Sequence, residues 1–399
     1  FKSPDVVGKI APEIKPGKYT YQDKASKPGL KQLMIPFMYE KLFRTSGPPL
    51  GATFSQFEVV PTTQQYHCLP NLEATLKNKG KTKVDAQGFM DWRTWESGIP
   101  FPEPSGSERH KAMQAIYNWE YQHSGLDAFI SPAISVGWDK NFRKLSEYVT
   151  IAEGFWLGGR VTDPPFGWYD ERAKRMGEYK IAVSPSIAPR EVYGNVTLLI
   201  TTLDPNVPNR LYAYAASLRR VRMLTGTDAQ DTAVGSNMTF DDSGGFARKL
   251  SPKVFPYEYN IMADREYLVP EPLAPGSTVH ITSKDLQIHN LKMVRRPVYV
   301  IELISKDSSY IYGRSVLYID KETFDLYWNE SYDQKGLLFR VIFSIFNFDP
   351  KTAAKYPGIQ PSWDVQVEQT AIAVETPIIP VRHHTRKRYS IGALQRFVK

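Results

Sequence analysis

The residues of this sequence that could do chemistry are few and scattered. Asp241 and Asp242 precede a Ser-Gly-Gly turn, and paired carboxylates in a glycine-rich turn suit a hard cation such as Ca²⁺. The segment lacks the Asp-x-Asp-x-Asp-Gly spacing of a calcium loop, so an Asx-type turn is the favoured interpretation. We therefore predict no metal site.

Histidine and cysteine add little to this picture. Of seven histidines only His383 and His384 are adjacent, and neighbouring side chains on an extended chain point apart, which disfavours a shared metal. Cys68 is the only cysteine, which excludes an intramolecular disulfide, and we expect a buried, inert thiol. The chain has no phosphate-binding loop, dinucleotide fingerprint, zincin motif or nucleophile elbow. These absences argue against an enzyme, and no cofactor is expected.

Aromatic and arginine side chains are the candidates for ligand binding. Most of the eight tryptophans should lie in the core, but a subset could line a cavity, since each ring can bury on the order of 200 Å². We select Trp138, Trp156 and Trp168, near the start of the predicted sheet. Arg219 and Arg220 could grip an acidic head group, and the alternative is a structural pair with Asp or Glu.

Three consecutive strands are the clearest elements of the sequence. Residues 310–319, 324–330 and 337–346 are rich in β-branched and aromatic side chains and are separated by polar turns. The run Val298 to Ile304 is apolar on both faces except at Glu302, which predicts a central strand that is covered on both sides. An unpaired buried carboxylate is costly, so we expect Glu302 to pair with Arg314 on a neighbouring strand.

The remaining pattern indicates a mainly β protein of the α+β class. Helices are predicted over 71–77 and 108–119, the second capped by Ser107. Eleven strands with few helices between them favour one large antiparallel sheet, and residues 224–277 read as an irregular excursion. The predicted strands cover residues 133–138, 148–155, 179–183, 191–202, 210–223, 278–282, 297–304, 310–319, 324–330, 337–346 and 365–374.

Length and charge suggest how the chain is organised. We divide its 399 residues into an extended N-terminal arm (1–35), one β domain (36–380) and a basic tail (381–399). Within the domain, residues 36–124 are irregular and helical, and 125–375 form the sheet. The net charge is +8, and the tail could bind anionic lipid or nucleic acid, although a solvated terminus is favoured. The chain begins at Phe1, and we expect an exported protein whose leader was removed.

The order of several short motifs resembles a bacterial domain-of-unknown-function family of outer-membrane lipoprotein-sorting-like proteins. The resemblance covers roughly residues 36–350. The motifs that carry it are Met38-Tyr-Glu-Lys-Leu with Gly47-Pro48, Val60-Pro-Thr-Thr63 with Tyr66-His67, Gly98-Ile-Pro-Phe-Pro-Glu-Pro-Ser-Gly106 with Asn118-Trp119, Leu218-Arg-Arg-Val221, Asp241-Asp242, Tyr318-Ile-Asp320 and Tyr332-Asp-Gln-Lys-Gly336.

This resemblance implies a fold like that of the lipoprotein carriers LolA and LolB, a curved antiparallel sheet or half-barrel with a few capping helices. It also implies a periplasmic or outer-membrane-associated, non-enzymatic protein that carries a hydrophobic or lipid-like molecule, alongside an exporter of the resistance–nodulation–division type. The alternative is a structural or interaction protein of the cell envelope without a small-molecule ligand. An enzyme using Asp241, Asp242 and a histidine is the least favoured class, and no nucleic-acid partner is expected.

Overall fold

Strands dominate the protein, as shown by a computed structural model that describes residues 8–62, 65, 67–122, 126–224, 230, 237–376 and 384–398. Within these described residues, sixteen strands share one sheet. They are β1 (Gly17–Thr20), β2 (Gln56–Val59), β5 (Ala128–Trp138), β6 (Lys144–Trp156), β9 (Glu178–Ala188), β10 (Val196–Thr202), β11 (Arg210–Ala215), β12 (Arg220–Leu224), β13 (Tyr257–Pro270), β16 (Lys292–Ser305), β17 (Arg314–Asp320), β18 (Leu326–Tyr332), β19 (Leu338–Phe343), β20 (Ile345–Asp349), β21 (Ala354–Asp364) and β22 (Gln369–Glu375).

Short hairpins and short helices make up the rest of the regular structure. The hairpin strands are β3 (Lys83–Val84), β4 (Met90–Asp91), β7 (Gly158–Arg160), β8 (Gly167–Trp168), β14 (His280–Ile281) and β15 (Ile288–His289). The helices are α1 (Asp23–Ser26), α2 (Gly29–Leu33), α3 (Leu69–Asn78), α4 (Glu108–Tyr121) and α5 (Glu171–Met176), with tighter or wider turns at η1 (Met38–Leu42), η2 (Trp92–Thr94), η4 (Phe240–Gly245) and η5 (Ile391–Val398). None of the described helices is long and apolar enough to span a membrane.

Two antiparallel runs of strands build the sheet. The first run has the strand order β5-β6-β9-β10-β11-β12, and the second run has the order β16-β17-β18-β19-β21-β22. Strand β13 pairs with β16 in antiparallel orientation. The runs join because the last strand of the sheet, β22, pairs with the first strand of the other run, β5, so that Thr370 lies opposite Trp138. The strand path starts at β1 and β2, where β2 pairs with β16 in parallel, and it ends at β12. Within the described residues β12 pairs with neither β1 nor β13, so the barrel is not closed. This confirms the predicted large, open antiparallel sheet.

The details of the strand prediction were partly wrong. Residues 224–277, predicted to be irregular, contain the fourteen-residue strand β13, whose outward side chains are polar and interrupt the apolar pattern. The predicted strand 210–223 is the hairpin of β11 and β12, and β21 was missed because proline and glycine at Pro357 and Gly358 resemble a turn. Helix α4 begins after Ser107, whose hydroxyl accepts the His110 N–H as predicted for an N-cap.

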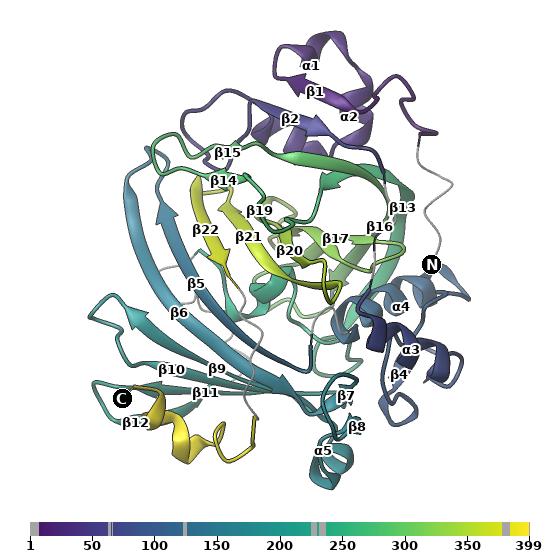
Figure 1. Cartoon of the computed structure of the whole chain (residues 1–399), viewed down its shortest axis with the longest axis vertical. Helices are drawn as coiled ribbons and strands as arrows, with labels where there is room; N and C mark the ends of the chain where they lie inside the picture. Colours follow the sequence, from purple (N-terminus) through teal and green to yellow (C-terminus); the bar gives the residue numbers. More distant parts are fainter. Residues whose placement is uncertain are drawn as a thin grey trace.

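The sheet curls around segments that touch strands far apart in its order. Helix α4 packs on β13, β16 and β17, while its Tyr121 lies 5.2 Å from the ring of Tyr179 on β9. Likewise, Asn237 bonds the carbonyl of Ser362 on β21, whereas Lys249 Nζ bonds the carbonyl of Thr202 on β10. The face of the sheet that these segments touch is therefore its inner face, and the opposite one its outer face. Figure 1 shows the long strands β5 and β6 arching on the left of the molecule, with α3 and α4 on the right.

Residues 30–60 cover the outer face of the second run. Phe37 packs against the indole rings of Trp328 and Trp363, with centroid separations of 6.0 and 5.8 Å. Residues 8–35 are not an extended arm: they form β1, α1 and α2, and they bury Leu30 and Leu33 in the same cluster. Such short helices have no readable period in sequence. Residues 1–7 of the predicted arm lie outside the described residues.

The central strand β16 is buried on both faces, as predicted from its sequence. Val298 and Val300 face the outer cluster around residues 30–60, whereas Tyr299 and Ile301 face the inner cluster around α4. Alternate side chains of a strand point to opposite faces, so this strand buries nearly every side chain. The apolar run at 298–304 therefore follows from its position between two layers.

The basic tail is docked rather than solvated. Tyr389 and Leu394 are buried against β6, β9 and β10 on the outer face. Arg388 forms an ion pair with Glu153 of β6, and Arg386 lies 2.5 Å from Asp170. The tail is therefore held by apolar packing and by ion pairs, a combination that its composition alone did not reveal. His383 lies outside the described residues.

Candidate functional site

A cleft of about 670 Å³ opens on the outer face beside the start of β16. The connection between β13 and β14 forms one wall, and β16, β20 and β21 form the other. Its lining residues are Gln65, Glu271, Pro272, Leu273, Ala274, Pro275, Gly276, Ser277, Thr278, Val279, Asn290, Lys292, Val294, Phe348 and Lys355. This volume lies within the range of small-molecule sites, roughly 300–1,000 Å³.

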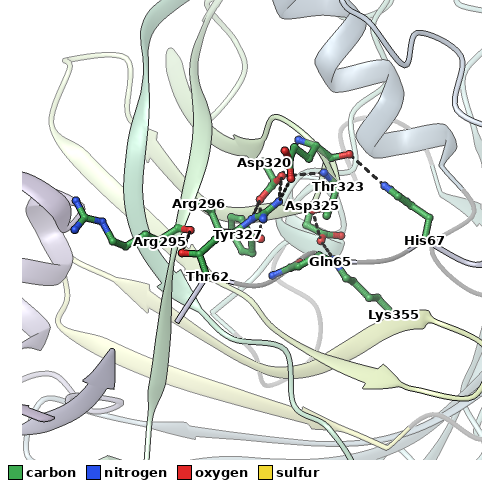
Figure 2. A network of polar contacts seen from close by, with 11 residues as sticks. Thr62, Gln65, His67, Arg295, Arg296, Asp320, Thr323, Asp325, Tyr327 and Lys355 are labelled. Atoms are coloured by element: carbon green, nitrogen blue, oxygen red, sulfur yellow. Dashed lines mark hydrogen bonds and ion pairs between the residues drawn. The ribbon is translucent and has the colours of Figure 1, made fainter. Parts of the chain in front are cut away.

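Lys355 is a lining residue of the cleft and belongs to a network of polar contacts (Figure 2). Its ammonium pairs with Asp325 Oδ2 and donates to Gln65 Oε1 at 2.9 Å. The hydroxyl of Thr323 donates to the same Asp325 oxygen at 2.6 Å. Because only 5% of Lys355 is exposed, this charge is held in place by protein groups rather than by water.

Arg296 on β16 and Asp320 on β17 form a buried ion pair in the same network (Figure 2). Arg296 holds Asp320 in a two-bond contact, Nε to Oδ2 2.8 Å and Nη2 to Oδ1 3.0 Å, and Tyr327 donates its hydroxyl to Oδ2. Burial alone would raise the pKa of Asp320, but Arg296 and the backbone N–H groups of Thr323 and Glu322 lower it to about 2. The carboxylate is thus ionised in the folded protein and fixes the turn between β17 and β18.

His67 packs beside this network without carrying a charge. Its Nε2 lies 3.2 Å from the carbonyl oxygen of Glu322. Burial, followed by the positive charge of Lys355, lowers the pKa of His67 to about 4. At neutral pH the imidazole is therefore uncharged and adds no positive charge beside Lys355 and Arg296.

The cleft combines apolar walls with charged groups. Leu273, Val279, Val294 and Phe348 supply apolar walls, while Lys292 and Lys355 supply cationic groups. Glu271 lies in the same cleft, and burial raises the pKa of its carboxyl group. An amphiphile with an apolar body and an acidic group matches this arrangement.

The inner face of β22, β5, β6, β9 and β10 offers a second accessible surface. Cross-strand pairs of small residues line it, among them Ser131 with Ala152 and Ser184 with Thr197. Most of these side chains are half-exposed although they lie in the middle of their strands. The members of this surface are Phe129, Ser131, Ala133, Ser135, Thr150, Ala152, Trp156, Lys180, Ala182, Ser184, Thr197, Leu199 and Ala373.

Charged groups gather at one end of this inner face. Glu120 of α4 interacts electrostatically with Lys180 of β9 and with Lys249. Burial raises the pKa of Glu120 and lowers the pKa of both lysines, and the charges of the three groups oppose these shifts. Lys180 also lies over the ring of Trp156 at 5.6 Å.

The tryptophans chosen from the sequence do not form one site. Trp138 is buried on the outer face. Trp156 lies on the inner face, with its ring 5.6 Å from that of Phe129. Trp168, in the β7–β8 hairpin, packs edge-on against Trp92 at 6.2 Å. Of the three, only Trp156 belongs to an accessible surface that could hold a ligand.

The chosen arginines lie elsewhere. Arg219, at a φ of +50°, and Arg220 form the exposed tip of the β11–β12 hairpin, so neither lies in the cleft nor on the small-residue surface. Glu302 and Arg314 form an ion pair, with Nε to Oε1 at 2.5 Å. The side chain of Glu302 is 18% exposed and that of Arg314 is 31% exposed, so this pair lies at the margin of the core.

The paired aspartates have structural partners. Asp241 lies 3.1 Å from Arg248 Nε, and Asp242 lies 2.9 Å from Arg340 Nη1. Asp242 also caps the turn η4 through the N–H of Thr239. Within the described residues, no group of three His, Cys, Asp or Glu side chains is arranged to hold a metal ion.

Sequence reasoning missed the residues that shape both surfaces. Lys355 is a single lysine in a strand, and its partners Asp325 and Gln65 are 30 and 290 residues away. The small residues of the inner face carried a readable signal, since Ala133 and Ser135 alternate with larger side chains within one strand. Only the curvature of the sheet identifies that side as the interior.

The fold defines a class of open, curved antiparallel-sheet proteins. It is similar to a putative outer-membrane lipoprotein-sorting protein domain from Vibrio parahaemolyticus (14% identity, TM-score 0.50, covering 72% of this chain and 99% of that one). It is also similar to a DUF1329 family protein from Desulfovibrio piger (12% identity, TM-score 0.51, covering 72% and 100%). A LolA superfamily protein from Nitrosomonas europaea matches with 11% identity and a TM-score of 0.42, covering 72% and 99%. At these identities the likeness concerns the fold.

The chain belongs to the family described as protein of unknown function DUF1329, whose model matches residues 52–388. This confirms the family resemblance inferred from the sequence. No curated protein matches the chain.

Proposed function

We propose that this protein is a non-enzymatic carrier of the bacterial envelope that shelters a hydrophobic, lipid-like molecule carrying an acidic group. The observation that supports this most strongly is the cleft of about 670 Å³, whose lining combines apolar walls with Lys292 and Lys355. Its relationship to a fold class that includes a putative lipoprotein-sorting domain agrees with a periplasmic location. An exporter of the resistance–nodulation–division type as partner belongs to the same proposal and is testable by co-purification.

The energetics of such a ligand are adequate. Each buried methylene contributes about 0.8 kcal/mol, so a dozen methylenes give on the order of 10 kcal/mol before the cost of association. A carboxylate or phosphate near Lys355 and Lys292 would add charge-assisted hydrogen bonds. Micromolar affinity is therefore within reach for a fatty acid or a lysophospholipid.

Titration of the full chain with dodecanoate and lysophospholipid, followed by tryptophan fluorescence and calorimetry, tests the carrier function. Ala274 is exposed on the wall of the cleft, so Ala274→Trp should fill the cleft and weaken binding without unfolding the protein. Ala152→Trp fills the inner face, and Ala86→Trp, at the tip of the β3–β4 hairpin, is the matched control.

The three variants separate the possible outcomes. Loss of binding in Ala274→Trp alone supports the cleft, and loss in Ala152→Trp alone moves the ligand to the inner face. No binding of either ligand at ~100 μM, equivalent to about 5.5 kcal/mol, would contradict the carrier function.

The alternative function is a scaffold of the cell envelope without a small ligand. One observation favours it: residues 30–60 and helix α4 fill both faces of β16 with side chains of the protein itself. If the protein is a scaffold, titration with dodecanoate or lysophospholipid should change neither tryptophan fluorescence nor the heat measured by calorimetry. The protein should still co-purify with an envelope partner.

A further inference from the structure

Two hairpin turns lie side by side at the same end of strands β9, β10, β11 and β12. Pro185, Val196, Tyr214 and Val221 face one another in one row across β9, β10, β11 and β12. The chain beyond this row, residues 186–195 and 215–220, therefore forms two neighbouring turns. The Ala216 N–H donates to Asn195 Oδ1 at 3.0 Å, which ties the turns together.

These tips expose large apolar side chains that water does not favour. Leu218 is 66% exposed, Tyr193 53% and Ile187 37%. A single exposed apolar residue is ordinary, but three on two linked turns are unusual for a surface that faces only water. Tyrosine and leucine at such tips are suited to the boundary between lipid head groups and acyl chains.

The same turns carry basic side chains. Arg190, Arg219 and Arg220 are exposed, against one acidic residue, Glu191. No ion pair engages these arginines within the part of the chain that the structure describes. Their charges are therefore available to an external anion.

The docked tail extends this basic surface. A hollow of about 470 Å³ is lined by Thr385, Lys387, Arg388, Ala393, Arg396 and Phe397. Phe397 packs in the same cluster as Val221, the residue that follows Arg220. In Figure 1 the yellow tail lies beside β10, β11 and β12. Arginine and lysine around such a hollow fit a phosphate group.

We propose that this edge, formed by turns 186–195 and 215–220 with the basic hollow of the tail, docks on the surface of a bilayer that contains anionic phospholipid. The arginines meet the lipid phosphates while Leu218, Tyr193 and Ile187 enter the interfacial layer. Membrane docking of this kind does not depend on the carrier function, because it uses neither the cleft nor the inner face.

Flotation of the full chain with vesicles of phosphatidylcholine, with and without phosphatidylglycerol, tests the docking. We expect binding only to vesicles that contain phosphatidylglycerol, and weaker binding as salt is raised. The triple variant Arg190→Gln, Arg219→Asn, Arg220→Gln should weaken partitioning about 100-fold, on the order of fivefold per arginine removed. Asparagine is chosen at position 219 because it tolerates the positive φ.

A second triple variant controls for total charge. Lys77→Gln, Lys81→Gln, Lys83→Gln removes three exposed charges near α3 and β3, on the opposite side of the molecule from the hairpin tips, and should bind as the parent does (Figure 1). Leu218→Ser should reduce the binding that remains at high salt. Equal loss in both triple variants, equal binding to both kinds of vesicle, or binding to a soluble polyanion but not to vesicles would overturn the proposal.

Discussion

Lys355, a lining residue of the cleft, forms a buried ion pair with Asp325, with the lysine ammonium against Asp325 Oδ2. The side chain of Lys355 is only 6% exposed, and that of Asp325 is only 3% exposed. Removing one partner from such a pair leaves a charge without compensation in a region of low polarity. The pair therefore links the candidate ligand site to the stability of the turn between β17 and β18.

Replacing Lys355 with methionine should lower the free energy of unfolding by about 3–5 kcal/mol, because Asp325 would remain buried and charged. Chemical denaturation followed by tryptophan fluorescence measures this. The exposed pair Lys144–Glu147 offers a matched control, and Lys144→Met should change stability by less than about 0.5 kcal/mol. Similar losses in the two variants would show that the network does not depend on Lys355.

His67 should make stability depend on pH between about 6.5 and 4. Burial, reinforced by Lys355, lowers its folded-state pKa to about 4, whereas the unfolded chain takes up the proton near 6.5. Its contribution is complete above pH 6.5 and is lost as the pH falls toward 4, on the order of 3 kcal/mol in total. Denaturation at a series of pH values should show this slope, and His67→Gln should remove it.

Asp320 supplies a separate, more acidic window. Despite burial, Arg296 and backbone N–H groups hold its pKa at about 2, below the value near 4 of an unfolded chain. Stability from this group is complete above pH 4 and is lost as the pH falls toward 2, by an amount on the order of 2 kcal/mol. In His67→Gln this lower slope should persist; its disappearance would mean that the two groups titrate as one.

Phe37 should anchor residues 30–60 to the sheet. It is 6% exposed and packs against Trp328 and Trp363, so Phe37→Ala should cost about 3–5 kcal/mol and alter tryptophan emission. Phe166→Ala, at a side chain that is 64% exposed, should have almost no effect. Equal stability of the two variants would show that residues 30–60 are not part of the folded core.

Arg314→Met should have a modest effect. The sequence predicted a buried carboxylate at Glu302 that pairs with Arg314, but both side chains remain partly exposed. Solvent screening limits such a pair to about 1 kcal/mol, to which the stacking of Arg314 over Tyr332 at 4.5 Å adds. Thermal unfolding checks this, and a loss as large as that of Lys355→Met would contradict the partial burial.

The local pattern of the chain determined its class and many of its strands. The apolar run Val298 to Ile304 required burial on both faces, and the runs that follow it required a meander, because side-chain alternation depends only on neighbouring residues. The family motifs, spread from Met38 to Gly336, added the open curved sheet. The strand positions follow from short-range rules, whereas the open, curved form of the sheet was implied by the family resemblance.

Tertiary structure alone decided where the surfaces lie. Pairing of β22 with β5 joins residues more than 200 positions apart, and the resulting curvature places Ala133 and Ala152 on the inner face of the sheet. The charged group in the cleft depends on the contacts of Lys355 with Asp325 and Gln65. The docked tail depends on the packing of Tyr389 against apolar side chains of β9 and β10. Such contacts depend on how distant segments fold back on one another, and periodicity and composition carry no information about that arrangement.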